Sequence, residues 1–428
     1  MKNNFLIITI LMLISASLNA QWDTITSFNQ DIMDLKSFDG KLFIGGNFTK
    51  NENNTCYWSA TYNGYVISKH TVMIGGSGIK SFDVFDNDLY AVGSMQHGYS
   101  AGVSKWDGST WQDGGSTNYS HSAIYTDNND LYVGSDDGVI RKKSVGGYFQ
   151  SFYNFNGNGS VSSIIRYGNE LIFAGAFDSI NGVEIESIAK WDGTNWTPLG
   201  TGVSGSIKCM AVYNNELYVA GDFDIAGGIS VKSIAKWDGS NWSKVGVGAS
   251  TIGWSGIRDM TVFNGELYVV GDFSLIGGVA TQDVAKWDGS QWSALNLNHD
   301  DSFVNCVEVY NNKLYVGTAD FNKSHVFVYN GSGIGISENF ANESSKFNIY
   351  PNPVIDDFNI EIESSNLDDI NIEVIDLLGN ILISENHQIS KNANISVKCE
   401  HLAKGTYIVL IREKNSKSII MHNKFVIN

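Results

Sequence analysis

Three observations in the sequence predict an all-β fold. Glycine occurs 45 times and aromatic residues make up 12% of the chain, whereas only 17% of its residues are charged; this composition is typical of strands joined by tight turns. A segment of about 45 residues recurs seven times, which is the period of a four-stranded propeller blade. Residues 346–428 lack the repeat and alternate apolar with polar positions. We therefore predict a seven-bladed β-propeller at residues 21–335, followed by a small C-terminal β-sandwich (Ig-like) domain at 346–428.

Residues 1–20 have the features of a secretory signal peptide. Lys2 supplies the positive charge, residues 5–14 form an apolar core, and small residues lead to a cleavage site after Ala20. A core of about ten residues is too short to span a bilayer, which needs about 20. We expect a mature chain that begins near Gln21, has no transmembrane segment and is exported at least to the periplasm.

The seven repeats align on one leucine in the second strand of each copy. These leucines are Leu42, Leu89, Leu131, Leu171, Leu217, Leu267 and Leu314. The copies predict an alternating strand A and a continuous apolar strand B such as LYVAG. In four copies strand C ends in KWDG and strand D begins at the next tryptophan. The Asp-Gly dipeptide between strands C and D favours a tight hairpin turn.

Nine of the eleven tryptophans belong to the repeat. Eight of them pair the end of strand C with the start of strand D: Trp106/Trp111, Trp191/Trp196, Trp237/Trp242 and Trp287/Trp292. The ninth, Trp22, lies in a segment at residues 21–28 that resembles a strand D, whereas the seventh copy ends after residues 325–331 without one. We predict that residues 21–28 pair with strand C of the seventh blade and close the ring, because an open array would leave a strand edge exposed.

The C-terminal region carries a more specific signal. After a polar linker at residues 336–345, the motifs YPNP, DLLGN and LAKGTY follow in this order, and the chain ends in a short strand. In these motifs residues 346–428 resemble the type A C-terminal sorting domain of the type IX secretion system of Bacteroidota. The resemblance implies that residues 346–428 engage the type IX secretion machinery, and that the protein passes through the periplasm and is secreted or displayed on the outer cell surface. The alternative is an ordinary accessory β-sandwich.

The repeat also resembles a known type of repeat, in LYVAGDF and IAKWDGSNW. Similar propeller repeats occur in secreted bacterial proteins and in fungal cortical cell-polarity markers. This resemblance supports the fold and implies no particular function.

The net charge and the motifs of the sequence limit the classes of function that the protein can have. A net charge of −17 argues against nucleic-acid binding, which needs a basic surface. The sequence has no Gly-x-Ser-x-Gly or Ser-x-x-Lys motif to indicate a nucleophile, and its propeller histidines lack the spacing of metal ligands. We therefore predict no catalytic residues, no metal and no cofactor.

The four cysteines and two aspartates each leave an alternative open. Cys209 and Cys306 occupy the same strand position in blades that are not neighbours, so buried thiols are favoured over a disulfide, and Cys56 and Cys399 have no evident partner. The aspartate that follows strand B in Gly-Asp-Phe, as at residue 222 and residue 272, could hold a turn through backbone N–H groups or ligate calcium.

The lengths of the predicted loops indicate which face of the propeller binds a ligand. The connections from strand B to C and from strand D to A are long, whereas the A–B and C–D turns are minimal, and loops on rigid scaffolds carry function. In these long loops we single out Trp58, His97, Tyr99 and Trp254, because aromatic faces on a polar rim suit sugar rings or peptide side chains. The alternative is that Trp58 and Trp254 cover the central channel or pack between loops.

These observations favour a secreted or surface-displayed propeller that binds an unknown glycan, peptide or matrix component without catalysing a reaction. The alternative is an extracellular carbohydrate-active enzyme with a carboxylate site on the long-loop face. A purely structural role in a surface layer is a third interpretation.

Overall fold

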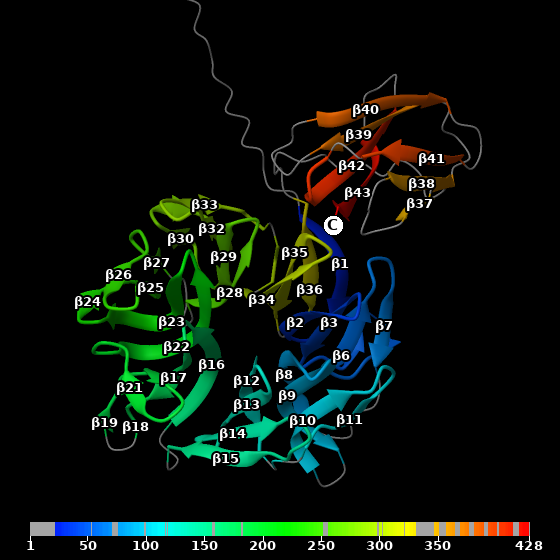
Figure 1. Cartoon of the computed structure of the whole chain (residues 1–428). Coiled ribbons are helices and arrows are strands. Elements are labelled where there is room, and N and C mark those ends of the chain that lie inside the picture. The colour runs from blue at the N-terminus through cyan, green and yellow to red at the C-terminus, as the bar shows by residue number, and fades with distance from the viewer. Residues whose placement is uncertain are drawn as a thin grey trace, which may run out of the picture. The chain divides into compact units, whose positions relative to one another are not determined.

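The computed structural model describes residues 22–427 with short gaps (Figure 1). The residues outside the description are 1–21, 53, 71–75, 98–99, 116, 118, 156–158, 181–182, 251–255, 298, 302, 321, 331–345, 351–356, 364–368, 376–380, 389–392, 400–401, 414–418 and 428. The predicted signal peptide at 1–20 and the predicted linker at 336–345 therefore lie outside the described residues. All regular structure in the described part is β-strand, and no helix there is long and apolar enough to cross a membrane.

The described residues form two compact units, one up to residue 331 and one from residue 332. In the first unit, three sheets of four antiparallel strands come from the first half of the chain. Sheet 1 contains β2 (Ile32–Phe38), β3 (Lys41–Gly46), β6 (Ser59–Tyr62) and β7 (Ile67–His70). Sheet 2 contains β8 (Gly76–Phe85), β9 (Asp88–His97), β10 (Ser100–Trp106) and β11 (Trp111–Asp113). Sheet 3 contains β12 (His121–Asp127), β13 (Asp130–Ser135), β14 (Val139–Ser144) and β15 (Gln150–Asn154).

Three further sheets follow the same order of strands A, B, C and D. Sheet 4 contains β16 (Gly159–Tyr167), β17 (Glu170–Phe177), β20 (Ile188–Trp191) and β21 (Trp196–Pro198). Sheet 5 contains β22 (Val203–Tyr213), β23 (Glu216–Ala226), β25 (Ile234–Trp237) and β26 (Trp242–Lys244). Sheet 6 contains β28 (Ile257–Phe263), β29 (Glu266–Gly271), β32 (Val284–Trp287) and β33 (Trp292–Ala294).

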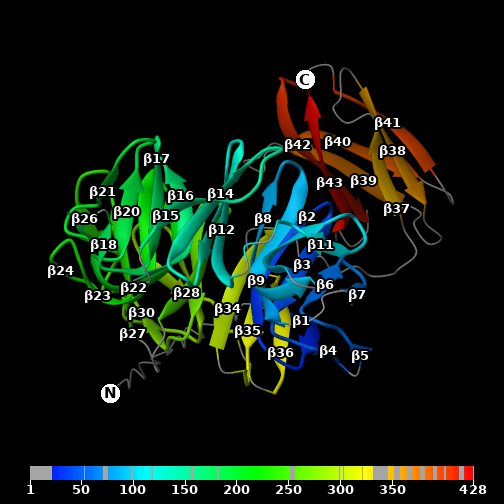
Figure 2. The same ribbon diagram turned by 90° about the horizontal axis from the view of Figure 1, so that it is seen from below.

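Sheet 7 combines the two ends of this unit. It contains β34 (Phe303–Tyr310), β35 (Lys313–Ala319), β36 (Ser324–Tyr329) and β1 (Trp22–Phe28). The yellow strands and blue β1 lie side by side in Figures 1 and 2. Trp22 is the register partner of Tyr329, just as Trp242 is the partner of Trp237 in sheet 5. The prediction that the N-terminal segment supplies the missing strand D is therefore confirmed.

The long connections hold small hairpins and so are not free loops. These additional strands are β4 (Lys50–Asn51), β5 (Asn54–Thr55), β18 (Ser179–Ile180), β19 (Val183–Glu184), β24 (Ile229–Ser230), β27 (Ala249–Ser250), β30 (Leu275–Ile276) and β31 (Val279–Ala280). Gly277, at the tip of the β30–β31 hairpin, has a φ of +60°, and a Cβ there would lie 2.3 Å from Cδ1 of Trp292. The glycine therefore lets the hairpin fold directly onto the strand-D tryptophan. One sequence expectation is corrected here: Asp222 lies within β23 and not in a loop.

The strands A of the seven sheets contact one another in chain order. β2 contacts β8, and the contacts continue through β12, β16, β22, β28 and β34, which contacts β2. Hydrophobic clusters in the described residues lie between consecutive sheets; the cluster of sheets 7 and 1, for example, unites Phe28 and Val326 with Ile44 and Phe48. Burial of apolar side chains between sheets thus stabilises this unit, because a single sheet would leave its apolar faces exposed to water.

Side chains satisfy backbone groups along the strands A. Each strand A has a partner on only one side within its sheet, so some of its N–H groups need acceptors elsewhere. The carboxylate of Asp34 in sheet 1 accepts a hydrogen bond from the backbone N–H of Phe82 in sheet 2 at 2.7 Å. The carboxylate of Asp259 in sheet 6 accepts a hydrogen bond from the backbone N–H of Val307 in sheet 7 at 2.9 Å. Acidic side chains of one sheet thereby hold the next sheet in register.

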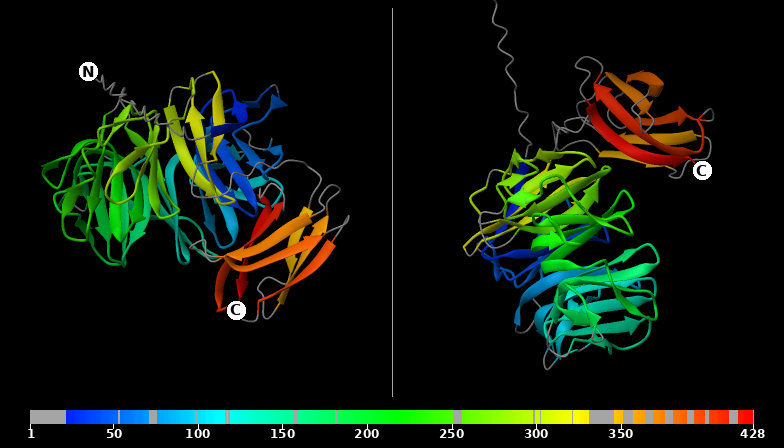
Figure 3. Two further views of the ribbon diagram at one scale, coloured as in Figure 1. Left: turned by 90° about the horizontal axis from the view of Figure 1, so that it is seen from above. Right: turned by 90° about the vertical axis from the view of Figure 1, so that its left-hand side faces the viewer.

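The second unit contains two antiparallel sheets (Figure 3). One contains β37 (Lys346–Tyr350), β38 (Asp357–Glu363) and β41 (Ala393–Lys398), and the other contains β40 (Ile381–Gln388), β39 (Asp369–Ile375), β42 (Gly405–Glu413) and β43 (Ile419–Ile427). Phe358 and Val397 of the first sheet share a buried cluster with Val374 and Val409 of the second. The hydroxyl of Tyr407, in the LAKGTY motif, donates to the carbonyl oxygen of Ala403 at 2.7 Å. The two sheets therefore share one core, as the alternating sequence pattern predicts.

Candidate functional site

The four residues singled out from the sequence do not form one exposed site among the described residues. Trp58 is only 7% exposed and belongs to the hydrophobic cluster between sheets 1 and 2, with the rings of Trp58 and Tyr57 6.0 Å apart. Its backbone has a φ of +60° and its N–H donates to the carbonyl oxygen of Phe48. Of the two roles considered for Trp58, packing and ligand contact, the burial of its side chain agrees with packing.

The other three nominated residues remain predictions. His97 is the last residue of β9, where its backbone pairs with that of Ser100. Tyr99 and Trp254 lie outside the described residues.

The face of the long connections carries a set of seven residues, six of them polar, that the sequence patterns did not identify. In each of the seven sheets, a β-bulge interrupts the register between strand A and strand B. One residue of strand A lies at this bulge in every sheet. These seven residues, which we call the inner rim, are Met33, Lys80, Ser122, Ser162, Lys208, Arg258 and Asn305. A bulge redirects a side chain out of the ordinary alternation, so the inner rim breaks the pattern on which sequence analysis relies.

Asp222 of sheet 5 contacts both Lys208 of the same sheet and the segment just before sheet 6 on this face. The Lys208 ammonium lies 2.9 Å from Oδ2 of Asp222, and the other carboxylate oxygen accepts from the backbone N–H of Gly256 at 2.9 Å. Of the two interpretations of Asp222, the hydrogen-bonding one describes these contacts. A related set occurs between sheets 2 and 3, where Lys80 lies 3.1 Å from Asp136.

Arg258 is the centre of the charged part of the inner rim. Its guanidinium lies 3.8 Å from the ring centroid of Phe303 and donates to Oδ1 of Asn305 at 3.0 Å. Asn305 in turn donates to the carbonyl oxygen of Ile32 at 2.9 Å, so these contacts run from sheet 6 through sheet 7 to sheet 1. Burial lowers the pKa of Arg258, and the nearby carboxylates, that of Asp272 foremost, oppose this effect.

Two carboxyl groups beside Arg258 are more easily protonated than ordinary aspartates. Burial raises the pKa of Asp31, and the positive charge of Arg258 offsets part of the effect. Burial also raises the pKa of Asp272, with a further contribution from the negative charge of Asp283. The surroundings of Arg258 therefore combine a cation with carboxyl groups whose charge depends on pH.

Two histidine–aspartate pairs lie next to this charged region. Nε2 of His299 is 3.2 Å from Oδ2 of Asp283, and Nδ1 of His325 is 2.8 Å from Oδ2 of Asp301. The His299 side chain is 1% exposed, and neither ring nitrogen has a hydrogen-bond partner within the part of the chain that the structure describes. The ring of Phe327 lies 6.2 Å from His299 and 5.4 Å from His325. Sequence reasoning missed these pairs because the partners lie far apart in the repeat. Asp283 and His299 come from different connections, and His325 of β36 meets Asp301 of the connection before β34.

Among the described residues, no group of three or more histidine, cysteine, aspartate or glutamate side chains could hold a metal ion. All four cysteines are buried and none of them forms a disulfide, which confirms the prediction of buried thiols. Burial raises the pKa of Cys56 to about 11, so this thiol is protonated and unreactive at neutral pH.

Comparison with known proteins identifies residues 348–428 and supports an all-β fold for the chain. Residues 348–428 match the family model described as a secretion system C-terminal sorting domain. Comparison with curated proteins finds no match. The structure is similar to the extracellular domain of a protein described as a hybrid two component system from B. thetaiotaomicron, with a TM-score of 0.53 and 12% identity, over 96% of this chain and 58% of that one. This chain thus spans little more than half the length of that structure.

A second similarity covers a smaller share of this chain. Catalytically inactive virginiamycin B lyase from Staphylococcus aureus matches with a TM-score of 0.50 and 11% identity, over 72% of this chain and 98% of that one. At such low identities both likenesses show an all-β fold alone. The sequence motifs, the two-sheet unit and the family match agree: residues 348–428 are a type IX secretion system C-terminal sorting domain, and the protein is secreted to the cell surface or the extracellular space.

Proposed function

We propose that sheets 1–7 form a closed seven-bladed β-propeller spanning residues 21–335, with a signal peptide at 1–20 and a linker at 336–345. The circular series of contacts between strands A and the pairing of β1 with β36 support this proposal. Small-angle scattering of the mature chain is expected to fit a disc-shaped domain with an attached smaller domain. An open, elongated first unit would contradict it.

The propeller is a non-enzymatic binding module for a glycan, a peptide or a matrix component, presented outside the cell by the sorting domain at 346–428. The observation that carries this proposal is the charged region around Arg258, where side chains of sheets 5, 6, 7 and 1 converge on the face of the long connections. Converging polar groups on a rigid scaffold are typical of a recognition site. The interior acids do not provide a reactive group: Asp34 and Asp259 are buried, and each accepts backbone N–H groups.

The test is a binding screen of the mature chain against glycan, peptide and matrix-protein arrays. The Arg258→Gln variant is expected to weaken binding of any ligand found by about tenfold or more, the cost of one charge-assisted hydrogen bond. Lys236→Gln is the matched control, because Lys236 pairs with Glu216 within a single sheet, away from the inner rim. Equal affinity of the Arg258→Gln variant and the parent chain would contradict the proposed site.

Export has its own test. A chain that lacks residues 346–428 is expected to accumulate in the periplasm, because the sorting domain is what the secretion machinery recognises. Surface delivery of the truncated chain would contradict the assignment of export to this domain.

A second candidate function is that of an extracellular carbohydrate-active enzyme on the same face. The raised pKa values of Asp31 and Asp272 favour it, because glycoside hydrolysis needs a carboxyl group that stays protonated. A hydrolysis screen on the mature chain distinguishes the two functions. Turnover that disappears in Asp272→Asn supports the enzyme, whereas ligand binding without turnover supports the binding module.

A further inference from the structure

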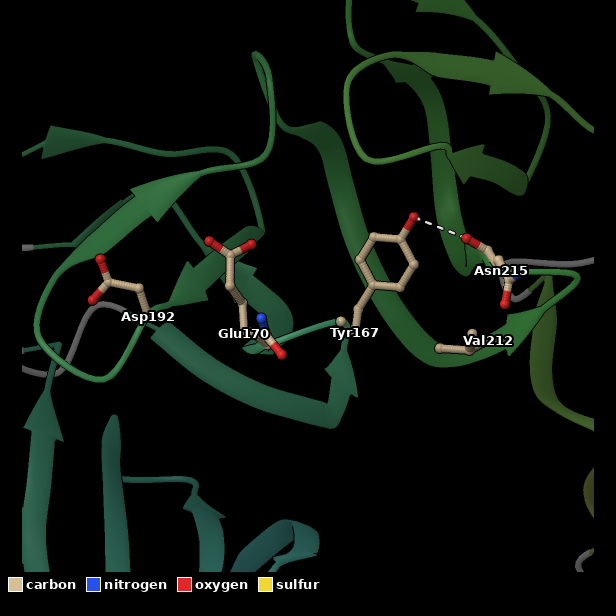
Figure 4. A pocket seen from close by; sticks show the side chains of 7 residues that line it. Tyr167, Glu170, Asp192, Val212 and Asn215 are labelled. Atoms are coloured by element: carbon tan, nitrogen blue, oxygen red, sulfur yellow. Dashed lines mark hydrogen bonds between the residues drawn. The ribbon is translucent and has the colours of Figure 1, made fainter.

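A cavity of about 650 Å³ opens on the face opposite the long connections, between sheets 4 and 5 (Figure 4). This volume lies within the range of small-molecule sites. The residues that matter for the argument are Tyr167, Asn169, Glu170, Asp192, Val212 and Asn215. All of them belong to A–B turns, to a C–D turn or to the strands next to these turns, so the cavity is separate from the inner rim.

The floor of the cavity is apolar and firmly held. Tyr167 ends strand A of sheet 4, and its hydroxyl donates to the backbone carbonyl oxygen of Asn215 in sheet 5 at 3.0 Å, so its ring bridges the two sheets. Val212 of strand A in sheet 5 is 37% exposed. A phenol ring and an exposed valine together offer a surface for C–H groups.

The walls of the cavity are polar and nearly balanced in charge. Glu170 lies 2.8 Å from the Lys190 ammonium, which neutralises it. Asp192 uses Oδ1 to accept two backbone N–H groups of its turn, both at 2.7 Å, and these bonds lower its pKa, so it is ionised at neutral pH. The exposed Asn169 and Asn215 add side-chain amides that can both donate and accept.

The next groove along the ring repeats this construction with two differences in its turns. Between sheets 5 and 6, Tyr213 donates to the carbonyl oxygen of Gly265 at 3.0 Å, and Asp238 accepts two turn N–H groups at 2.7 Å. Gly265 stands where the first groove has Asn215, and Asn214 stands where it has Gly168. The tyrosine bridge and the aspartate turn are therefore structural features of the repeat, and the amide of Asn215 is particular to the cavity between sheets 4 and 5.

We propose that this cavity binds a neutral pyranose residue of a glycan. The ring of Tyr167 and the Val212 side chain contact the C–H face of the sugar, the carboxylates of Glu170 and Asp192 accept from its hydroxyl groups, and the Asn215 amide donates to a hydroxyl oxygen. The pairing of Glu170 with Lys190 leaves little excess charge to attract a cation, and Asp192 disfavours an anion. This site lies apart from the one under the proposed function.

The test uses the mature chain and isothermal titration with cellohexaose, maltohexaose, xylohexaose, laminarihexaose and mannohexaose, with hexalysine as the cationic comparison. At least one neutral oligosaccharide is expected to bind with one site per chain. Asn215→Gly and Asp192→Asn are each expected to weaken binding at least tenfold, because each variant keeps its turn: glycine suits the φ of +62° at residue 215, and asparagine can accept the same N–H groups.

Two controls make the result specific. Asp238→Asn alters the equivalent aspartate of the neighbouring groove and is expected to leave affinity unchanged. Gly265→Asn is expected to raise the number of sites from one to two, since a Cβ at residue 265 meets no atom within 4 Å and asparagine tolerates a φ of +76°. Binding of hexalysine alone, absence of binding by every oligosaccharide, or equal affinity of Asn215→Gly and the parent chain would overturn the proposal.

Discussion

Sheet 6 and sheet 7 make the same contacts with differently connected chains. In sheet 6 the strand-D residue Trp292 follows its partner Trp287 through a tight turn, the ring centroids are 5.1 Å apart, and the Trp292 indole donates to the carbonyl oxygen of Val245 at 3.3 Å. In sheet 7 the partners Trp22 and Tyr329 come from opposite ends of the unit, their ring centroids are 4.9 Å apart, and the Trp22 indole donates to the carbonyl oxygen of Leu295 at 2.9 Å.

The two sheets therefore share the same side-chain and backbone contacts, although only in sheet 6 are strands C and D consecutive in the chain. They differ in the conformational entropy that is lost when strand D becomes ordered. In sheet 6 the partner strand is tethered by a short turn, whereas in sheet 7 ordering the N-terminal strand closes a loop of some 300 residues, at a cost that grows slowly with loop length. We therefore expect sheet 7 to be the part of the first unit most sensitive to loss of its strand D.

Removing β1 is expected to have the largest effect. A chain that begins at Asn29 loses strand D of sheet 7 and the buried Phe28, and it exposes the edge of β36. We expect loss of the cooperative thermal transition of the first unit or aggregation, measured by calorimetry and light scattering. A circular permutant that joins Asn330 to Trp22 through the sequence DGSQ, with new termini at Asn29 and Gln30, is the control and should fold. Retention of the parent transition after simple deletion would show that β1 is dispensable.

Single tryptophan substitutions compare the two sheets directly. Trp292→Ala removes a buried indole and is expected to cost about 3–5 kcal/mol, whereas Trp22→Ala removes a half-buried one and is expected to cost roughly 2–4 kcal/mol. Denaturant unfolding measures both changes in the free energy of unfolding. In the circular permutant the cost of Trp22→Ala should be the same, because the contacts do not change. An effect of Trp22→Ala below about 0.5 kcal/mol, as for an ordinary surface substitution, would contradict the structural role of Trp22.

A glycine substitution separates steric contact from backbone conformation. Gly277→Ala places a Cβ 2.3 Å from Trp292 and is expected to cost about 1–3 kcal/mol in the free energy of unfolding. Gly278→Ala is the control: a Cβ there meets nothing within 4 Å, so only the φ of +83° is unfavourable, at about 1 kcal/mol. Equal effects of the two variants would show that the hairpin does not need contact with the tryptophan.

A last effect is a pH dependence of the junctions between sheets 1 and 2 and between sheets 6 and 7. Burial raises the pKa of Asp34 to about 7 and that of Asp259 to about 8, above the value of about 3.9 for an unfolded aspartate. The folded chain therefore binds more protons than the unfolded chain between about pH 4 and pH 8, so the contribution of these groups to stability is complete at low pH and is lost as pH rises through this window.

The Asp259→Asn variant tests this dependence. Its melting temperature is expected to fall less between pH 5 and pH 8 than that of the parent chain, because one of the two titrating groups is gone. Asp238→Asn is the control, since Asp238 is exposed and turn hydrogen bonds lower its pKa, which places its titration below this range. A parent melting temperature that rises steadily from pH 5 to pH 8 would contradict the sign of the effect.

Local regularity explains which parts of the fold could be predicted. The apolar run of β23, the Asp-Gly turns and the C/D tryptophan pairs depend on residues a few positions apart, so one repeat contains the whole signal. The pairing of Trp22 with sheet 7 was also predictable. The seventh copy of the repeat has no strand D of its own, and residues 21–28 resemble a strand D that belongs to no other copy.

Contacts between repeats explain what was missed. The sequence left open whether Trp58 packs or contacts a ligand, because its burial between sheets 1 and 2 depends on the neighbouring sheet. The contacts of Arg258 with Phe303 and Asn305 depend on a bulge and on the stagger of adjacent strands A, neither of which leaves a periodic trace.

The sequence by itself determined the all-β class, the repeat and its composite last sheet, and the sorting domain at the C-terminus. These properties follow from the spacing of apolar residues, the residues found in turns and the order of the motifs. Each of these signals depends on residues that are close together in the sequence. Only the tertiary structure decided which side chains converge at the inner rim and which line the cavity beside Tyr167. Such sites are assembled from neighbouring sheets, and their geometry is set by how the sheets pack against one another and not by any one segment.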